Sequence, residues 1–265
     1  MIIYKTQEQA ELIRLSCKIV NDAIAETAKM IKPGITTMQL NNRAEEYIRS
    51  KGAIPSFKNY NGFPFACCMS VNDAVVHGFP NDIPLKEGDV VSVDVGAFMN
   101  NFHGDSAYTF VIRDTKPEIV ELLRTTKESL YKGIEKAIAG NRIGDISYAI
   151  QQHTEKQKGY GVVRELVGHG LGNHLHEEPQ VPNYGRRGSG TVLKEGLVIA
   201  IEPMINLGKR YVYTAEDNWT ILTEDGKPSA HFEHTVLVKK GKADILSSFE
   251  HIEEAERNNE YLYSE

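Results

Sequence analysis

Two matching stretches of the sequence decide the fold. The first is Leu85-Lys-Glu-Gly-Asp-Val-Val-Ser-Val-Asp94, and the second is Leu193-Lys-Glu-Gly-Leu-Val-Ile-Ala-Ile-Glu202. Each opens on a turn, continues as an apolar strand and ends in a carboxylate, and the second follows the first by 108 residues. A period of this length indicates a duplicated half-domain, because the units of a solenoid run to roughly 20–50 residues. The sequence therefore predicts two related halves, at about 30–115 and 138–240.

Helices are predicted on both sides of these strands. Thr6 and Gln9 form a capping-box pattern, and apolar residues then recur at helical spacing until Pro33, which predicts one long N-terminal helix within residues 1–30 or shortly beyond. Further helices are predicted over 36–52, 116–139 and 145–158. We expect an apolar strand over 162–167 and mostly strands from there to about residue 240. The remaining residues, 247–265, form a polar tail with the composition of a final helix.

The composition is that of an ordinary globular chain, with 41% hydrophobic and 25% charged residues. The net charge is −6 and the sequence has no long Lys/Arg block, so nothing in the charge pattern indicates binding to nucleic acid or to an anionic membrane. The N-terminus lacks the apolar run of a signal peptide or anchor, so we expect a cytoplasmic protein. Three cysteines, Cys17, Cys67 and Cys68, cannot all pair, and we expect reduced thiols. The adjacent two are interpreted as small buried residues of one strand.

Asp94 lies inside an apolar strand. Side chains alternate along a strand, so Asp94 shares a face with Val90 and Ser92. An ionised carboxylate is almost never buried alone, because its desolvation costs several kcal/mol unless a partner or a metal compensates. Glu202 repeats the situation at the end of the second stretch. The repeat therefore predicts two acids at matching positions.

Two further acids, Asp105 and Glu233, would add negative charge close to this pair. A hairpin predicted near Met99-Asn100-Asn101 would bring Asp94 and Asp105 nearly opposite each other on adjacent strands. Like charges in that position repel. Either one acid keeps a proton or a cation lies between them, and Glu233, which also has an apolar strand context, favours the cation.

His169 is the predicted nitrogen ligand. It stands in Gly168-His169-Gly170, where the small neighbours allow the backbone to approach a crowded centre. By itself such a histidine is more often an ordinary loop residue. The acids predicted at the ends of strands favour a functional role for it. One imidazole and several carboxylates, with no thiolate pattern, suit manganese, iron(II), cobalt or zinc. Two ions bridged by shared carboxylates would activate a water molecule and polarise a scissile carbonyl.

The sequence resembles the methionine aminopeptidases of the pita-bread metallopeptidase family over roughly residues 5 to 240. The motifs that carry the resemblance are Val71-Asn-Asp-Ala-Val-Val-His77-Gly, Val93-Asp94-Val-Gly, His103-Gly-Asp105, Gly168-His169-Gly-Leu-Gly, His176-Glu-Glu-Pro179, Ile201-Glu202-Pro203-Met204 and Glu233-His-Thr-Val. The resemblance implies an α+β fold with one curved, mostly antiparallel sheet covered by helices. It implies a single catalytic domain, residues 1–265, with two pseudo-symmetric halves.

The resemblance also implies roles for the site residues. Asp94 and Asp105 would bind one ion, His169 and Glu202 the second, and Asp105 and Glu233 would bridge both. His77 and His176 would lie beside this centre and contact the substrate amide and the developing oxyanion, and Glu202 would double as a proton shuttle. From the residues alone neither histidine stands out, because five others compete with them: His103, His153, His174, His231 and His234. Among these, His153 is expected on the polar face of a helix.

A pocket for a methionine side chain is implied by aromatic and sulfur-containing positions, which here are Phe57, Tyr60, Phe63, Cys68, Leu175 and Trp219. Aromatic surfaces suit the polarizable, flexible thioether of methionine. The alternative for each residue is plain core packing, with nearly equal weight for Phe57 and Leu175. Three positions depart from the family pattern: Asn61 stands where a histidine is frequent, Phe63 lacks the usual tyrosine hydroxyl, and Leu175 replaces an aromatic residue.

The implied activity is removal of the initiator methionine from nascent polypeptides whose next residue is small, by a monomer with the ribosome as a candidate partner. Only 33 positions separate His169 from Glu202, which leaves no room for the insertion of type II enzymes and favours type I. A prolidase or Xaa-Pro aminopeptidase shares the five ligands but usually carries a separate N-terminal domain. A non-catalytic binding protein of this fold would be expected to lose ligands, and a calcium-stabilised structural protein would leave the histidines unexplained.

Overall fold

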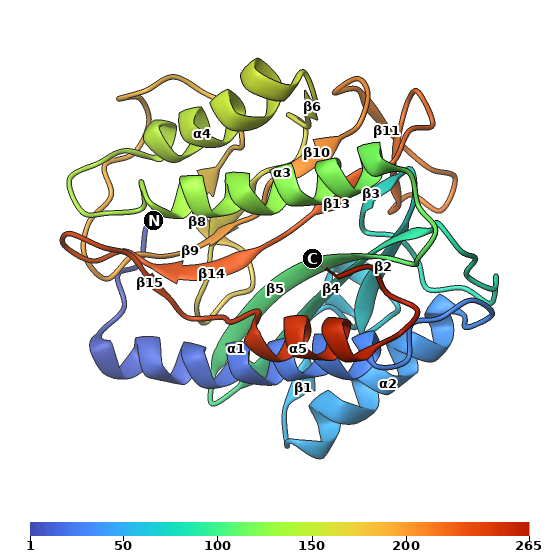
Figure 1. Ribbon diagram of the computed structural model, residues 1–265. Coiled ribbons are helices and arrows are strands. Elements are labelled where there is room, and N and C mark those ends of the chain that lie inside the picture. The colour runs from blue at the N-terminus through green and yellow to red at the C-terminus, as the bar shows by residue number, and fades with distance from the viewer. Residues whose placement is uncertain (265) are drawn as a thin grey trace.

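The computed structural model describes residues 1–264 and contains five α-helices in that range. Figure 1 shows α3 and α4 on one side of the strands and α1, α2 and α5 on the other. The helices are α1 (Gln7–Ala28), α2 (Thr37–Ser50), α3 (Pro117–Ile134), α4 (Ile143–Gln151) and α5 (Glu250–Asn258). Capping boxes at Thr6 and Thr36 fix the starts of α1 and α2, and the sequence predicts the first of them.

All strand pairs of the sheets in residues 1–264 are antiparallel. In the five-stranded sheet β9 lies between β14 and β7. In the four-stranded sheet β4 lies between β2 and β5. The strands are β1 (Ile54–Pro55), β2 (Cys67–Val71), β3 (Ala74–Val76), β4 (Val90–Met99), β5 (Phe102–Val111), β6 (Gly161–Val162), β7 (Gly168–Gly170), β8 (Glu177–Val181), β9 (Val198–Ile201), β10 (Met204–Asn206), β11 (Val212–Thr214), β12 (Ile221–Thr223), β13 (Ser229–His231), β14 (His234–Leu237) and β15 (Asp244–Ile245). The fold is therefore α+β, with short helical turns at Tyr60–Gly62 and Gln152–Lys156.

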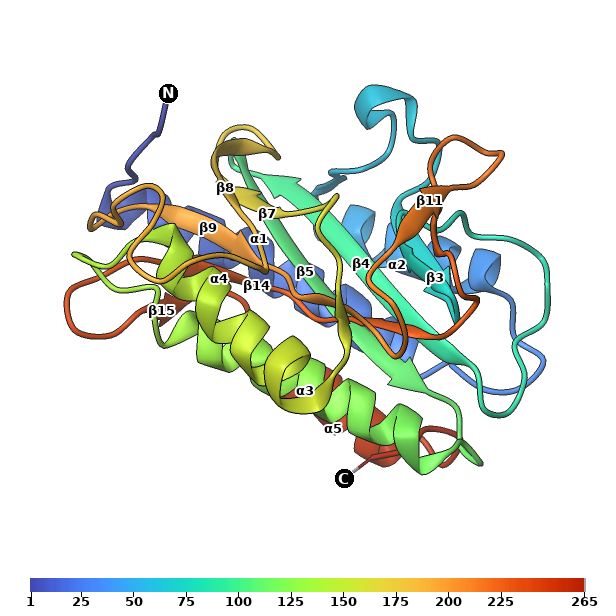
Figure 2. The same ribbon diagram turned by 90° about the horizontal axis from the view of Figure 1, so that it is seen from above.

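The hairpin of β4 and β5 is the longest strand pair, and Figure 2 shows the two strands running side by side. Asn100 and Asn101 form its two-residue turn with φ values of 53° and 65°, a left-handed conformation that asparagine tolerates well. The predicted turn is confirmed. Helix α1 packs closely across β5: a Cβ added at Gly104 would lie 2.4 Å from the backbone nitrogen of Cys17. Gly104 therefore allows the helix to touch the strand.

The repeated stretches become equivalent strands. β9 starts at Val198, 108 residues after the start of β4 at Val90. Helices α1 and α2 pack on the sheet of β2, β4 and β5. In the second half, α3 packs on β9, β10 and β13, and α4 packs on α3 and β8. Buried apolar residues from both halves form one large cluster, which includes Val93, Phe110, Ile199 and Phe232.

The two halves meet where β5 runs beside residues 231–235. The Ser106 hydroxyl donates to the Glu233 carbonyl at 2.8 Å, and the Thr235 hydroxyl donates to the Asp105 carbonyl at 2.8 Å. The Glu233 backbone N–H donates to the Ala107 carbonyl at 2.9 Å. Buried hydroxyls thus join the two halves beside Asp105 and Glu233. We call this contact between β5 and residues 231–235 the seam, and the sequence pattern did not predict it.

Two expectations need correction. The strand expected over 162–167 is limited to Gly161–Val162, because the following residues leave the sheet and run along a cavity. His153 is buried, 8% exposed, because a π-helical turn follows α4 and shifts the helical face on which this residue lies. The tail contains the final helix that its composition predicts, α5, and Ile252 and Ala255 are buried on it. Within residues 1–264 no helix has the length and apolarity needed to cross a bilayer.

Candidate metal centre

Five residues predicted as metal ligands line one cavity of about 360 Å³. Asp94 comes from the middle of β4, and Asp105 comes from β5. His169 is the central residue of β7, Glu202 directly follows β9, and Glu233 directly precedes β14. Strands from both halves of the chain therefore bring these side chains to a common point.

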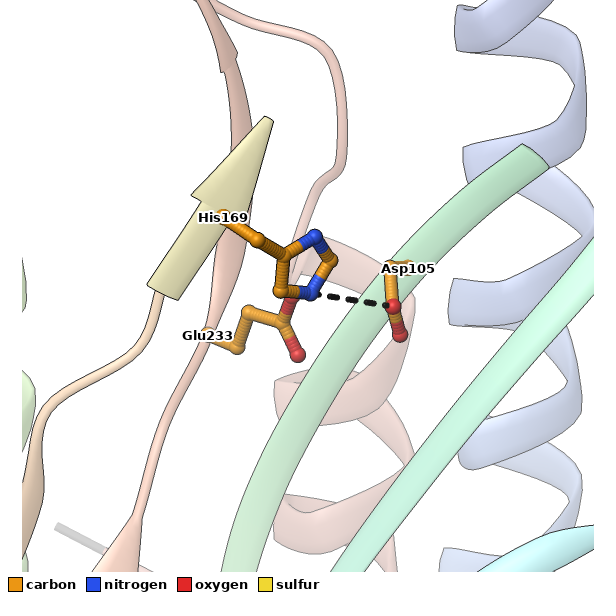
Figure 3. Close-up of side chains that lie close together, drawn as sticks. All are labelled: Asp105, His169 and Glu233. Carbon is orange, nitrogen blue, oxygen red and sulfur yellow. Dashed lines mark ion pairs between the residues drawn. The ribbon is translucent and has the colours of Figure 1, made fainter. Parts of the chain in front are cut away.

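Asp105, His169 and Glu233 are the most compact group of the centre. One ligand atom from each lies within 4.8 Å of the others, and Figure 3 shows the three side chains pointing toward one another. The His169 Nε2 atom lies 3.9 Å from Asp105 Oδ2 and 3.5 Å from Glu202 Oε1. These distances are longer than that of a normal hydrogen bond. The side chains therefore converge on a common point without bonding closely to one another.

The buried acids of the centre have no protein partner for some of their oxygens. Asp94 Oδ1, Asp105 Oδ1 and Glu233 Oε1 are buried without a hydrogen bond. Burial raises the pKa of Asp94 to about 7, and burial together with the neighbouring acids raises the pKa of Asp105 and Glu233 well above the ordinary range. Oxygens that lack partners, beside one imidazole, are the donor set that a divalent transition metal prefers. The residues therefore fit a metal.

Glu202 differs from the other acids. Burial raises the pKa of its carboxyl, but the imidazoles of His231 and His169 outweigh burial and lower it. The His231 Nε2 atom lies 3.6 Å from Glu202 Oε2, and both ring nitrogens of His231 are buried without a hydrogen bond. Sequence reasoning treated His231 only as a competitor of His77 and His176. A signal was present, because His231 precedes Glu233 by two residues and such residues share a face in extended chain.

His77 and His176 both line the cavity. His77 directly follows β3 and has a φ of 56°, a strained value for a residue with a side chain. His176 directly precedes β8, and its ring lies 4.3 Å from the ring of His169. The His176 Nδ1 atom lies 2.8 Å from the Tyr60 hydroxyl. Part of the His176 ring is open to solvent. Partial burial by the cavity walls and the nearby His169 nevertheless lower the pKa of His176 to about 4, so its ring is neutral at pH 7.

The predicted methionine-pocket residues line the same cavity, and these are Phe57, Tyr60, Phe63, Cys68, Leu175 and Trp219. Phe63 and Trp219 meet edge to face with ring centroids 5.2 Å apart. Cys68 is buried in β2 beside Cys67, and burial raises the pKa of both thiols well above the usual value. Sequence reasoning missed several other lining residues, namely Val76, Glu165, Leu166, Val167 and Met204.

The remaining histidines do not line the cavity. His103 bonds Ser56 at 2.9 Å, and His234 bonds Ser247 at 2.6 Å while stacking on Phe249. His153, in the π-helical turn that follows α4, pairs with Glu128 of α3 at 2.8 Å. The structure therefore separates His77 and His176 from most of the histidines that compete with them in the sequence.

Comparisons with known proteins agree with this site. The model of metallopeptidase family M24 matches residues 11–240. Methionine aminopeptidase 1 of Bacillus subtilis is 49% identical over 247 residues, which cover 93% of this chain and 99% of the relative. Methionine aminopeptidase of Clostridium perfringens is 48% identical with the same coverage.

Solved structures show the same similarity. Methionine aminopeptidase from Rickettsia prowazekii superposes with a TM-score of 0.91 at 39% identity, covering 94% of this chain and all of that one. The prolidase from Pyrococcus furiosus gives a TM-score of 0.76 at 26% identity, and this chain covers 65% of it. The metal-fitting donor set, the family match over most of the chain and the full-length relatives lead to one conclusion. The chain belongs to metallopeptidase family M24, among its methionine aminopeptidases.

Proposed function

We propose that this enzyme removes an N-terminal methionine from nascent polypeptides when the next residue is small. The observation that supports this is the arrangement of one cavity, where a metal-fitting cluster of acids and His169 adjoins a wall of aromatic and sulfur-containing side chains. Such a wall suits the thioether of methionine, and the cluster suits the adjacent scissile bond. The bacterial relatives that share the chain's length are methionine aminopeptidases by name.

We assign two divalent ions to the centre. Asp94 and Asp105 would hold one ion, His169 and Glu202 the other, and Asp105 and Glu233 would bridge them. Cobalt, manganese, iron(II) and zinc all suit this donor set. When bound, such a pair supplies Lewis-acid polarisation of the scissile carbonyl and activates a water molecule. The partnerless oxygens of the buried acids support this assignment.

The chain's own residues would orient and protonate the substrate. Because the Tyr60 hydroxyl lies at hydrogen-bond distance from His176 Nδ1, it can donate there and leave the proton of the neutral ring on Nε2. That N–H would then donate to the oxyanion that develops at the scissile carbonyl. His77, which lines the same cavity, would contact the substrate amide. Glu202, whose carboxyl is held in the ionised form, would accept a proton from the attacking water and pass it to the leaving amine.

The wider proposal covers the organisation of the chain. We infer one catalytic domain of two related halves, a type I enzyme, a monomer, and a cytoplasmic site of action with the ribosome as a candidate partner. The matching start of β4 and β9 supports the two halves. The alternative, cleavage of Xaa-Pro peptides, rests on a fold shared with the more distant prolidases and on no residue of this cavity in particular.

A peptide panel tests the proposed function. The protein is stripped of metal, reloaded separately with Co²⁺, Mn²⁺, Fe²⁺ or Zn²⁺, and offered Met-Ala-Ser, Met-Leu-Ser, Leu-Ala-Ser and Ala-Pro-Ser. We expect metal-dependent release of methionine from Met-Ala-Ser and little cleavage of the other three. Comparable cleavage of Ala-Pro-Ser would favour the proline-specific alternative, and activity of the stripped protein would contradict the assignment of the metal centre.

A further inference from the structure

A fully buried ion pair lies behind the loop that carries His176. The Lys5 Nζ atom lies 2.6 Å from Glu177 Oε2, and the side chains are 1% and 4% exposed. The two residues are 172 positions apart in the sequence. Exposed ion pairs contribute little, whereas removing one partner of a buried pair leaves an uncompensated charge, so the geometry around such a pair is strongly constrained.

Lys5 is held in place through its backbone. Its N–H donates to the Gly196 carbonyl at 2.6 Å, and Tyr4 forms a bridge with Leu197 at the entry to β9. Directly after Lys5, Thr6 caps helix α1. The ammonium group is therefore fixed relative to both α1 and the strand that leads to Glu202.

Glu177 holds the loop between β7 and β8, which ends at His176. Its second oxygen, Oε1, accepts a hydrogen bond from the His174 backbone N–H at 3.2 Å, and the Gly172 N–H donates to the His174 carbonyl at 3.1 Å. A Cβ added at Gly172 would lie 2.2 Å from Lys5 Cε and 2.7 Å from Glu177 Oε1. The loop thus closes directly over the lysine side chain, and Gly172 leaves the room for it.

We propose that the Lys5–Glu177 ion pair positions His176 for the reaction. The proposal rests on the proposed function, in which His176 contacts the developing oxyanion. Glu177 is the next residue after His176, and its carboxylate accepts from the His174 N–H, so loss of the ion pair loosens the loop that places the imidazole beside His169 and Tyr60. A misplacement of about 1 Å is enough to lower turnover strongly, whereas the proposed methionine-pocket residues other than Leu175 lie outside this loop. Lys5, Glu177 and Gly172 are positioning residues that do not touch substrate.

The test compares the metal-loaded wild type with two variants. Lys5→Met combined with Glu177→Gln removes both charges and keeps the volume, and Gly172→Ala displaces the lysine without changing any charge. We expect each to lower kcat for Met-Ala-Ser by at least about tenfold, with KM changed less than about twofold. The matched control is Lys127→Met, which breaks the 2.5 Å ion pair between α3 and α5 and should leave kcat unchanged.

Two further measurements distinguish positioning from general destabilisation. In a His176→Ala background the charge-free double variant should cause no further loss of kcat, because its effect passes through the missing ring. In the metal-free protein, hydrogen exchange of the 172–178 segment should become faster in the charge-free double variant, with the titrated Mn²⁺ affinity unchanged.

The outcomes separate this inference from the proposed function. If His176→Ala lowers kcat but the charge-free double variant does not, the ion pair has no positioning role. Losses that simply add in the His176→Ala background would also overturn the inference. If His176→Ala itself retains wild-type kcat, the role of His176 in the proposed function is wrong, and the inference fails with it.

Discussion

Asp94 and Asp105 lie on paired strands two positions out of register, with Asp94 opposite Ala107 and Asp105 opposite Gly96. Both therefore project from the same face of the hairpin as diagonal neighbours. A Cβ added at Gly96 would lie 2.7 Å from Phe57 Cε1, so the glycine leaves room for the Phe57 ring. Glu233 approaches Asp105 from the other half of the chain, across the seam formed by Ser106 and Thr235.

Replacing one ligand should separate the chemistry from the fold. We expect Asp94→Asn to lower kcat/KM for Met-Ala-Ser by more than about 100-fold, since even residues that only support metal ligands cost 10–100-fold. The metal-free variant should be more stable than the metal-free wild type at pH 8, by about 1–3 kcal/mol, because it lacks one buried charge. Steady-state kinetics, metal analysis and urea unfolding check both expectations. Retained activity in the metal-analysed variant would refute the ligand assignment.

Metal-induced stabilisation should increase with pH. Burial raises the pKa of Asp94 to about 7, so the folded, metal-free protein keeps this proton at pH 5.5 and has lost it at pH 8. A metal ion must displace the proton at the lower pH, which weakens binding, and each tenfold loss of affinity removes about 1.4 kcal/mol of stabilisation. We expect the rise in Tm on adding Mn²⁺ to be larger at pH 8 than at pH 5.5. An equal rise at both pH values would contradict the raised pKa.

The strands that carry the ligands could be predicted from the sequence because their cause is local. Asn100-Asn101 specifies a two-residue hairpin turn, and the apolar runs before Asp94 and Glu202 specify buried strands. The seam could not be predicted in this way. It depends on hydroxyls of β5 meeting carbonyls more than 120 positions away, and no periodicity encodes such a pairing.

Trp219 should contribute to substrate selection. It lines the cavity and meets Phe63 edge to face, so Trp219→Ala would remove one wall of the proposed methionine pocket. We expect kcat/KM for Met-Ala-Ser to fall about tenfold, which corresponds to roughly 1.4 kcal/mol of lost apolar contact. The control is Tyr213→Ala on β11, an exposed aromatic residue outside the cavity lining. Equal effects of the two substitutions would argue against a specific pocket wall.

Glu256 should make global stability depend on pH. Burial raises its carboxyl pKa to about 7, although the Tyr108 hydroxyl donates to it at 2.9 Å. The folded state therefore binds this proton more tightly than the unfolded state, and stability is lost as pH rises from about 4.5 to 7. We expect Glu256→Gln to stabilise the protein relative to the wild type by about 3 kcal/mol more at pH 8 than at pH 4.5.

Urea unfolding of metal-free protein at the two pH values measures this difference. Glu254→Gln, at an exposed position of the same helix, is the matched control and should show no such dependence. A pH-independent difference for Glu256→Gln would show that the carboxyl titrates normally in the folded state.

Burial of single side chains was the least predictable property. His153 follows a helical pattern that the π-helical turn interrupts, so its predicted polar face is wrong. His231 and Glu202 approach each other from different strands, and only the assembled sheet brings them to 3.6 Å. The lining residues Leu166 and Val167 resemble strand residues in composition, but they leave the sheet at the cavity. In each case tertiary packing overrides the local pattern.

A metal ion at the seam between β5 and residues 231–235 would connect metal supply with the lifetime of the protein. Asp105 and Glu233 repel each other across this seam, and a cation between them would turn the repulsion into attraction. A chain deprived of metal would open here more often and offer proteases an unfolded segment, and degradation in cells follows the population of such open forms. Metal shortage would then reduce the amount of enzyme as well as the activity of each molecule.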